Sequence, residues 1–203
     1  MALIKATSVT GGTDVTIKAS EAGSLITIDQ RIVWPAKGYG FQAMATSAVA
    51  ALVVRPDTTA IATLRNNSAN KNLVIEEAFA HNLVAIANGA FSIWLCSHPA
   101  GMATVTNDIT VRNSTNGNPA GGSQTSFDNG ATVVDDGWFP WGTSIHNVTI
   151  TVPGGMAIAP VNGRIIVPPT GGISLSVVGG TTSITVTAGF RWYEVPASEL
   201  TNS

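Results

Sequence analysis

The residues of this sequence that could serve as acids, bases, nucleophiles or metal ligands are few and widely spaced. The three histidines, His81, His98 and His146, do not follow the spacing of a metal-binding motif. The single cysteine, Cys96, lies in the apolar stretch of residues 91–96, where a cysteine usually packs as a small hydrophobic side chain. One cysteine also excludes an intrachain disulfide. We therefore expect neither a metal site nor a cofactor site.

Two adjacent carboxylates, Asp135 and Asp136, offer a second kind of chemistry. Glycoside hydrolysis requires two carboxyl groups that face each other across a sugar, roughly 5–9 Å apart. Adjacent residues of an extended segment point in opposite directions, so this pair is more typical of an Asp-Asp-Gly turn. The sequence also contains no nucleophile elbow, phosphate-binding loop or His-Glu zinc motif. We expect that the protein is not an enzyme.

Aromatic residues give the best candidates for a binding site. Trp138, Phe139 and Trp141 fall within four positions of a segment flanked by Gly and Pro. Exposed aromatic side chains in such a loop could stack on sugar rings or anchor in a pocket of a protein partner. The alternative is that the loop folds back and packs within its own subunit. Trp34 and Tyr39, in the link between the first residues and the rest of the chain, are two further candidates for partner contact.

The chain carries little charge. Of its 203 residues, 44% are hydrophobic and 11% are charged, whereas an ordinary soluble domain has roughly 25% charged residues. A surface poor in charge indicates a protein that buries much of it against other protein copies. A Thr-rich β-domain that tolerates a neutral surface is the alternative. The net charge of −2 predicts binding to neither nucleic acid nor an anionic membrane.

Targeting and membrane signals are weak. The first residues lack the apolar core of a signal peptide. The apolar run of residues 48–54 is far too short to cross a bilayer. We expect a protein that is made in the cytoplasm and stays there until it is assembled.

The elements that position these residues are predicted to be strands. In residues 162–196, apolar residues alternate with Ser and Thr between clusters of Gly and Pro, which is the signature of β-strands. Residues 173–177 and 184–188, separated by a turn at residues 179–182, are predicted to form a hairpin that closes a β-sandwich. Short strands are also expected at residues 108–112 and 131–134.

Residues 72–87 fit two templates. Their apolar positions suit an amphipathic helix, but they also suit a long strand. The following residues 91–97 have the pattern of a strand, and Asn88-Gly89 is a typical hairpin turn. We therefore favour a hairpin of two strands over a helix.

The chain divides into an N-terminal extension, residues 1–40, and a main domain, residues 41–203. The extension contains short alternating pieces among glycines and forms either an extra hairpin or an extended arm that orders against a neighbour. Many short strands with Gly/Pro turns and little helix indicate an all-β sandwich or jelly roll for the main domain.

Four stretches carry a resemblance to a known group of proteins. They are residues 70–75 (NKNLVI), 130–142 (GATVVDDGWFPWG), 162–172 (NGRIIVPPTGG) and 187–196 (TAGFRWYEVP). Together they resemble small structural proteins of tailed bacteriophages that contain a jelly roll similar to tumour necrosis factor. The resemblance covers residues 40–196 and rests on strand pattern and turn chemistry. It implies a jelly-roll fold, assembly as a homotrimer and no catalytic residues.

The resemblance and the low charge together lead to one main expectation. The protein is expected to be a virion structural protein, made in the host cytoplasm, that decorates or cements a capsid through contacts with the major capsid protein. The alternative is a tail or fibre component that binds host glycans through the Trp138–Trp141 loop. The sequence leaves capsid and tail locations open.

Overall fold

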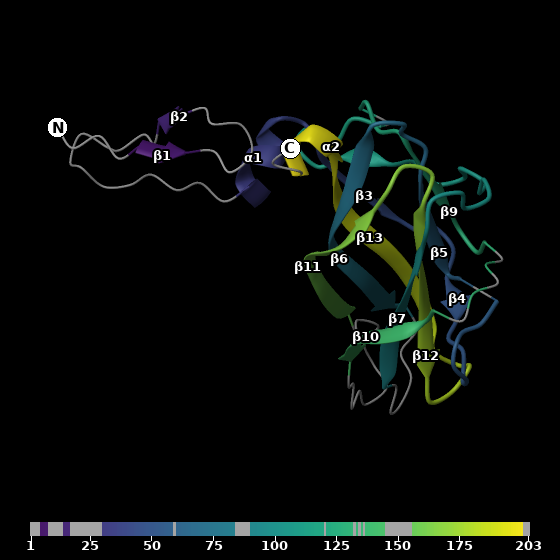
Figure 1. Cartoon of the computed structure of the whole chain (residues 1–203). Coiled ribbons are helices and arrows are strands. Elements are labelled where there is room, and N and C mark those ends of the chain that lie inside the picture. Colours follow the sequence, from purple (N-terminus) through teal and green to yellow (C-terminus); the bar gives the residue numbers. More distant parts are fainter. Residues whose placement is uncertain are drawn as a thin grey trace.

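The computed structural model describes a β-sandwich with two short helices close together at one end (Figure 1). The described residues are 5–7, 14–16, 30–58, 60–83, 90–119, 121–131, 133, 135, 137–144 and 156–200. The all-β sandwich expected from the sequence is confirmed. Neither helix of the described part, α1 (Gln30–Ala36) or α2 (Ala197–Leu200), is long and apolar enough to cross a membrane.

Two antiparallel sheets form the sandwich. The larger sheet has the strand order β11 (Met156–Val167), β6 (Lys71–Asn82), β13 (Thr185–Pro196), β3 (Gly40–Met44), β8 (Arg112–Asn113), and β4 (Val49–Ala50) also pairs with β13. The smaller sheet has the order β10 (Phe139–Ser144), β7 (Phe91–His98), β12 (Gly172–Gly179), β5 (Ala62–Asn66), β9 (Thr125–Asp128). We call them the six-stranded and the five-stranded sheet.

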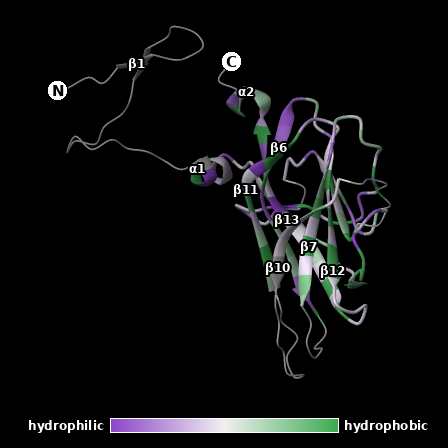
Figure 2. Cartoon of the chain, turned by 60° about the horizontal axis from the view of Figure 1, so that its bottom comes forward, coloured by the Kyte–Doolittle hydropathy of each residue, from purple (hydrophilic) through white to green (hydrophobic). Residues whose placement is uncertain are grey.

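The core lies between the two sheets and is filled by alternate residues of their strands. The alternation of hydrophobic and less hydrophobic residues along the strands can be followed in Figure 2. Phe127 of the five-stranded sheet meets Phe190 of the six-stranded sheet edge-on, with ring centroids 6.3 Å apart. Phe190 and Trp192 are fully buried, as their place in the closing strand predicted. The inward residues of both sheets thus form one hydrophobic cluster.

The strand prediction for residues 72–82 is confirmed, because β6 runs through them. Both predicted hairpins are wrong. β12 and β13 lie in different sheets, and so do β6 and β7. In each case the apolar sides of the two strands meet across the core, which satisfies the same alternation as a hairpin would. The turn proposed at Asn88-Gly89 lies outside the described residues.

Three smaller predictions are also corrected. Of residues 108–112, only Arg112 belongs to a strand, and the described residues between 131 and 134 belong to none. Residues 139–142, expected as part of a loop, belong to strand β10, which pairs with β7. In the first 40 residues, β1 (Lys5–Thr7) pairs with β2 (Asp14–Thr16) in antiparallel fashion, as in the hairpin that was one of the two alternatives, whereas helix α1 was not predicted.

Candidate functional site

The outer face of the six-stranded sheet carries an apolar row that crosses four strands. Ile158 on β11 pairs with Phe79 on β6, Phe79 pairs with Gly189 on β13, and Gly189 pairs with Met44 on β3. Ile158 is 50% exposed and Met44 is 47% exposed. We call Ile158, Phe79, Gly189 and Met44 the apolar row.

The row is continuous because Gly189 has no side chain. A β carbon on Gly189 would come within 2.7 Å of Cζ of Phe79 and 2.9 Å of the α carbon of Met44. The Phe79 ring therefore reaches across the glycine toward Met44. Beside Met44 and Phe79 lies a surface hollow of about 450 Å³ that also has Ile109 and Arg112 in its wall.

The first half of strand β11, residues 156–161, is apolar on both of its faces, whereas Asn162 and Arg164 farther along are exposed. Its inward residues, Ala157, Ala159 and Val161, are buried, while Met156 and Ile158 on the other side are 42% and 50% exposed. An antiparallel sheet with one face in water normally alternates hydrophobic residues inside with polar residues outside. The outer side of this half of β11 thus has the composition of a covered face.

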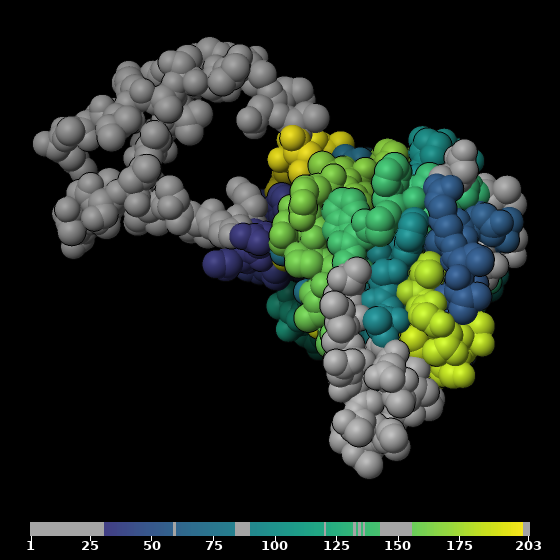
Figure 3. All heavy atoms as spheres, turned by 90° about the horizontal axis from the view of Figure 1, so that it is seen from below, coloured from purple at the N-terminus to yellow at the C-terminus, as the bar shows by residue number. Residues whose placement is uncertain are grey.

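Neighbouring side chains limit the row on one side. Arg191 pairs with Glu77 and places its guanidinium 5.3 Å from the centre of the Phe79 ring. At the edge of the sheet, β11 lies beside β10, as the space-filling view of Figure 3 shows. The indole N–H of Trp141 on β10 donates to the carbonyl of Pro160 on β11 at 3.1 Å. This contact closes the sandwich between the two sheets.

The aromatic candidates of residues 138–141 have separate environments. Trp138 is 1% exposed and packs with Ala60, Cys96 and Val133 on the outer side of the five-stranded sheet. Its assignment as an accessible partner-binding residue is therefore corrected: the segment folds back onto its own subunit, and the indole fills a small second core. Phe139 is 67% exposed. Trp141 is half-buried, with the Arg164 guanidinium 5.5 Å from its ring centre.

Trp34 and Tyr39 lie together at the end of the domain where helix α1 packs. The Trp34 ring on α1 lies 5.3 Å from the ring of Tyr193. The Tyr39 hydroxyl donates to Glu199 on α2 at 3.2 Å, and Glu199 also pairs with Lys37 at 3.0 Å. Both aromatic side chains are half-buried. They hold the two helices against the sheet, and no described contact assigns them to a partner.

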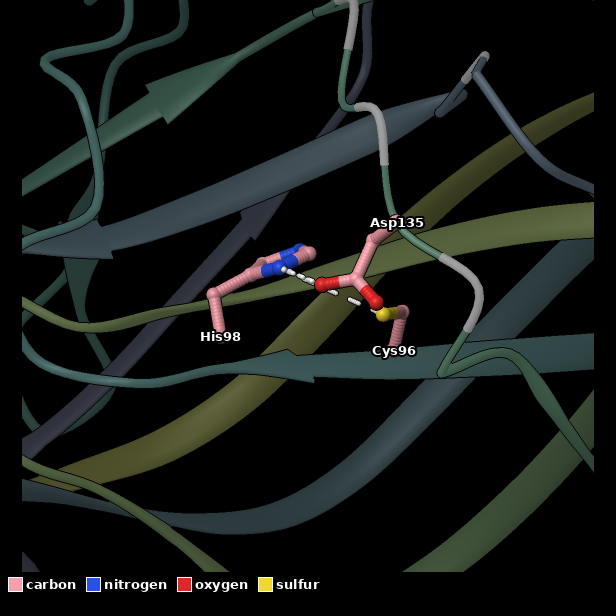
Figure 4. A group of neighbouring side chains, drawn as sticks. All are labelled: Cys96, His98 and Asp135. Atoms are coloured by element: carbon pink, nitrogen blue, oxygen red, sulfur yellow. Dashed lines mark hydrogen bonds and ion pairs between the residues drawn. The ribbon is translucent and has the colours of Figure 1, made fainter.

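A cluster of polar side chains lies under the segment that contains Trp138 (Figure 4). His98 is at its centre: Nδ1 lies 2.9 Å from Oδ2 of Asp135, and Nε2 lies 2.8 Å from Oγ of Ser174. Ser174 is also 3.0 Å from the hydroxyl of Thr63. Cys96 Sγ lies 4.0 Å from His98 Nδ1. We call these five residues the His98 cluster.

Three strands and one loop position the His98 cluster. Cys96 and His98 are two residues apart on β7 and so share its outer face. Ser174 on β12 pairs with Cys96 and with Thr63 on β5, which places all three side chains on that face. Asp135 is brought over the sheet because its backbone N–H donates to the carbonyl of Asp57 at 3.1 Å.

Asp135 is held as a carboxylate. The backbone N–H of Gly137 donates to its Oδ1 at 2.8 Å, and this bond is the largest cause that lowers the pKa of Asp135 from its usual value. Burial acts in the opposite direction, and the contacts with His98 and Cys96 lower the pKa further. The Asp135–Gly137 bond is also the turn that the sequence predicted.

The hydrogen bonds from Ser174 through His98 to Asp135 have the order of a nucleophile, a base and an orienting acid. However, Ser174 is 0% exposed in the middle of β12, between β5 and β7. A substrate carbonyl has no path to its hydroxyl in this arrangement. The histidine, the thiol and the carboxylate are instead close enough to share one ion, since their ligand atoms all lie within 4.8 Å of one another.

Sequence reasoning treated Cys96 and His98 as isolated. The Cys-x-His spacing on a predicted strand was the one signal that could have placed them on a common face. Asp135 lies 37 positions from His98, and no local pattern joins the two.

Comparisons with known proteins add little. No protein-family model and no curated protein matches this sequence. Among solved structures, the chain is similar to the crystal structure of the infectious bursal disease virus VP2 subviral particle, with 14% identity and a TM-score of 0.11. The match covers 99% of this chain and 49% of the VP2 chain, so this chain spans about half of its length. A likeness this weak carries no argument about fold or function.

Proposed function

We propose that this protein is a virion structural protein of a bacteriophage, a capsid decoration or cement protein that works as a homotrimer. The observation that carries the proposal is the apolar outer side of β11, continued across the six-stranded sheet by the apolar row. Such a face is expected where protein copies meet. The phage identity itself rests on the sequence resemblance.

The exposed apolar face is too small to hold two subunits together firmly by itself. Full burial of a large apolar side chain contributes about 1.5–3 kcal/mol. Met44, Met156, Ile158 and Ile166 are each about half exposed, so covering all four contributes about 3–6 kcal/mol per subunit. Association costs at least about 4 kcal/mol in lost freedom of motion. These four side chains alone therefore support a weak contact, which assembly as a trimer and further contacts strengthen.

The N-terminal extension supplies the further contact in this proposal. The chain enters the domain through helix α1, which is fixed to the sheet by Trp34 and to Glu76 by Arg31 at 3.5 Å. An arm that starts at this point reaches the capsid shell or a neighbouring trimer. Three arms per trimer act together, so weak single contacts add up to firm attachment. Because only the assembled shell offers the site, binding shifts the equilibrium toward the intact shell.

The first test is the mass of the purified chain in solution, measured by light scattering across a concentration series. We expect a trimer for the full chain and also for a variant that lacks residues 1–29, which leaves α1 in place. The truncated trimer is expected to lose binding to capsids of its phage in a co-sedimentation assay. A full chain that stays monomeric at the highest concentration would contradict the proposed trimer. Full decoration of capsids by the truncated chain would contradict the proposed role of the N-terminal arm in attachment.

A further inference from the structure

The His98 cluster brings together three kinds of metal ligand. Cys96 and His98 are buried, with side chains on the outer face of β7, and Asp135 approaches them from the covering segment. Sulfur, imidazole nitrogen and carboxylate oxygen are the three atom types that bind Zn²⁺ in proteins. Figure 4 shows the three side chains pointing toward one another.

We propose that Cys96, His98 and Asp135 bind a single divalent ion of the zinc class. Thiolate and imidazole ligands select Zn²⁺ over the hard ions Mg²⁺ and Ca²⁺. Binding releases the thiol proton of Cys96 to solvent, because the thiolate is the ligand. The thiolate and the Asp135 carboxylate then balance the two positive charges of the ion, so a neutral group is buried.

The distances require only small movements. In tetrahedral zinc coordination, the ligand nitrogen and oxygen lie about 3.4 Å apart, and the nitrogen and sulfur about 3.6 Å. The corresponding distances here are 2.9 Å between His98 Nδ1 and Asp135 Oδ2, and 4.0 Å between His98 Nδ1 and Cys96 Sγ. Shifts of about half an ångström therefore bring these two pairs to coordination distance, and all three ligand atoms lie within 4.8 Å of one another.

Ser174 and Thr63 allow His98 to switch tautomer. With a metal on Nδ1, the ring must carry its proton on Nε2, which then donates to Ser174 Oγ. Ser174 in turn donates to Thr63, and either of these two hydroxyls can be the donor. Without a metal, Nδ1–H donates to Asp135 and the hydroxyl chain runs in reverse. The same five residues thus satisfy both states, and Ser174 is a positioning residue.

The cluster meets a surface hollow at His98. This hollow of about 330 Å³ is lined by His98, Met102, Thr104 and Val133, among others. It gives the ion a path of entry and gives a water molecule access as fourth ligand. Once bound, the ion links Asp135 to β7 and fixes the segment that contains Trp138. This site is independent of the assembly proposal.

The test is a Co²⁺ titration of the full chain after treatment with a chelator that is then removed. We expect one equivalent to bind and to give the near-ultraviolet charge-transfer absorption of a cobalt thiolate. Cys96→Ser should abolish that absorption, and Asp135→Asn, which has the same shape, should weaken binding at least about tenfold. His81→Gln, which removes a histidine of the other sheet, is the matched control and should bind as the unaltered chain does. If the unaltered chain shows no thiolate absorption at a large excess of Co²⁺, the proposal is wrong.

Zn²⁺ gives a second readout that separates binding from folding. At a hundredfold excess over Kd, the unaltered chain should gain about 5–10 °C in Tm. Ser174→Ala should keep the cobalt thiolate absorption but weaken binding about 10–100-fold. If the Cys96→Ser variant does not fold, the Zn²⁺ affinity of the Asp135→Asn variant tests the site by itself. Equal Zn²⁺ affinity of Asp135→Asn and the unaltered chain would place the ion elsewhere and overturn the site.

Discussion

The ring of Phe79 packs against Gly189 so closely that a β carbon on Gly189 would lie only 2.7 Å from Cζ of the ring. The two residues pair directly across β6 and β13, in the middle of the six-stranded sheet. The glycine is thus a condition for the apolar row, since any larger residue would displace the ring.

Gly189→Ala should destabilise the fold. The added methyl group meets the backbone of β3 as well as the Phe79 ring, and overpacking of this kind typically costs about 1–3 kcal/mol. The free energy of unfolding in urea measures the loss. Gly180→Ala is the matched control, because nothing lies within 4 Å of a β carbon there. Equal stability of the two variants would show that β3 and Phe79 move aside freely.

Ile158→Asp should weaken self-association without unfolding the domain. The side chain is 50% exposed in the subunit, so the charge is tolerated by the monomer but not in a covered apolar face. Light scattering is expected to show a smaller mass at equal concentration. Val54→Asp is the control, since Val54 is 66% exposed and lies outside the row. If Val54→Asp dissociates the protein and Ile158→Asp does not, the interface lies elsewhere.

Trp138→Ala should destabilise the subunit by about 3–5 kcal/mol, because the indole is buried in the second core. Phe139→Ala, one residue away, should change stability by less than about 0.5 kcal/mol, since that ring is 67% exposed. Thermal unfolding of the two variants checks the contrast. A stable Trp138→Ala variant would mean that the covering segment contributes little to the fold.

Glu194→Ala should cost about 2–4 kcal/mol. The carboxylate is completely buried, accepts from the hydroxyl of Ser123 at 2.6 Å and from the backbone N–H of Gln124 at 3.0 Å, and lies 3.9 Å from Lys71 Nζ. Its removal leaves these donors without an acceptor. Glu199→Ala is the control: that carboxylate is partly exposed, so losing its pair with Lys37 should cost less than about 1 kcal/mol. Urea unfolding compares the two, and equal losses would contradict the role given to burial.

Alternation of residues was enough to predict the long strands of residues 72–82, 91–97 and 162–196 but not their partners. The apolar positions of residues 173–177 and 184–188 indicate which side of each strand is buried. They do not state whether the two buried sides lie next to each other in one sheet or opposite each other in two. The Gly-Gly turn between them suits both arrangements, and the structure has the second.

The candidate sites were predictable to different extents. The low charge pointed to a covered surface, but the row itself depends on the register of four strands, which the sequence does not contain. Trp138 and Phe139 are adjacent and alike in type, yet one is buried and the other exposed. Phe139 is the first residue of β10, whereas Trp138 lies just before that strand and packs with Ala60, Cys96 and Val133, contacts that no local pattern in the sequence indicates.

The position of β13 has a consequence for how the protein is made. β13 lies between β6 and β3, so each of these strands has one unpaired edge until residues 185–196 have been synthesised, although β11 pairs with the other edge of β6 and β8 with that of β3. A nascent chain therefore leaves the ribosome with one edge of β6 and one edge of β3 unpaired, and such edges are prone to aggregate. Folding of this domain must wait for its closing strand, and a chain interrupted before residue 185 is expected to be a substrate for chaperones or proteases.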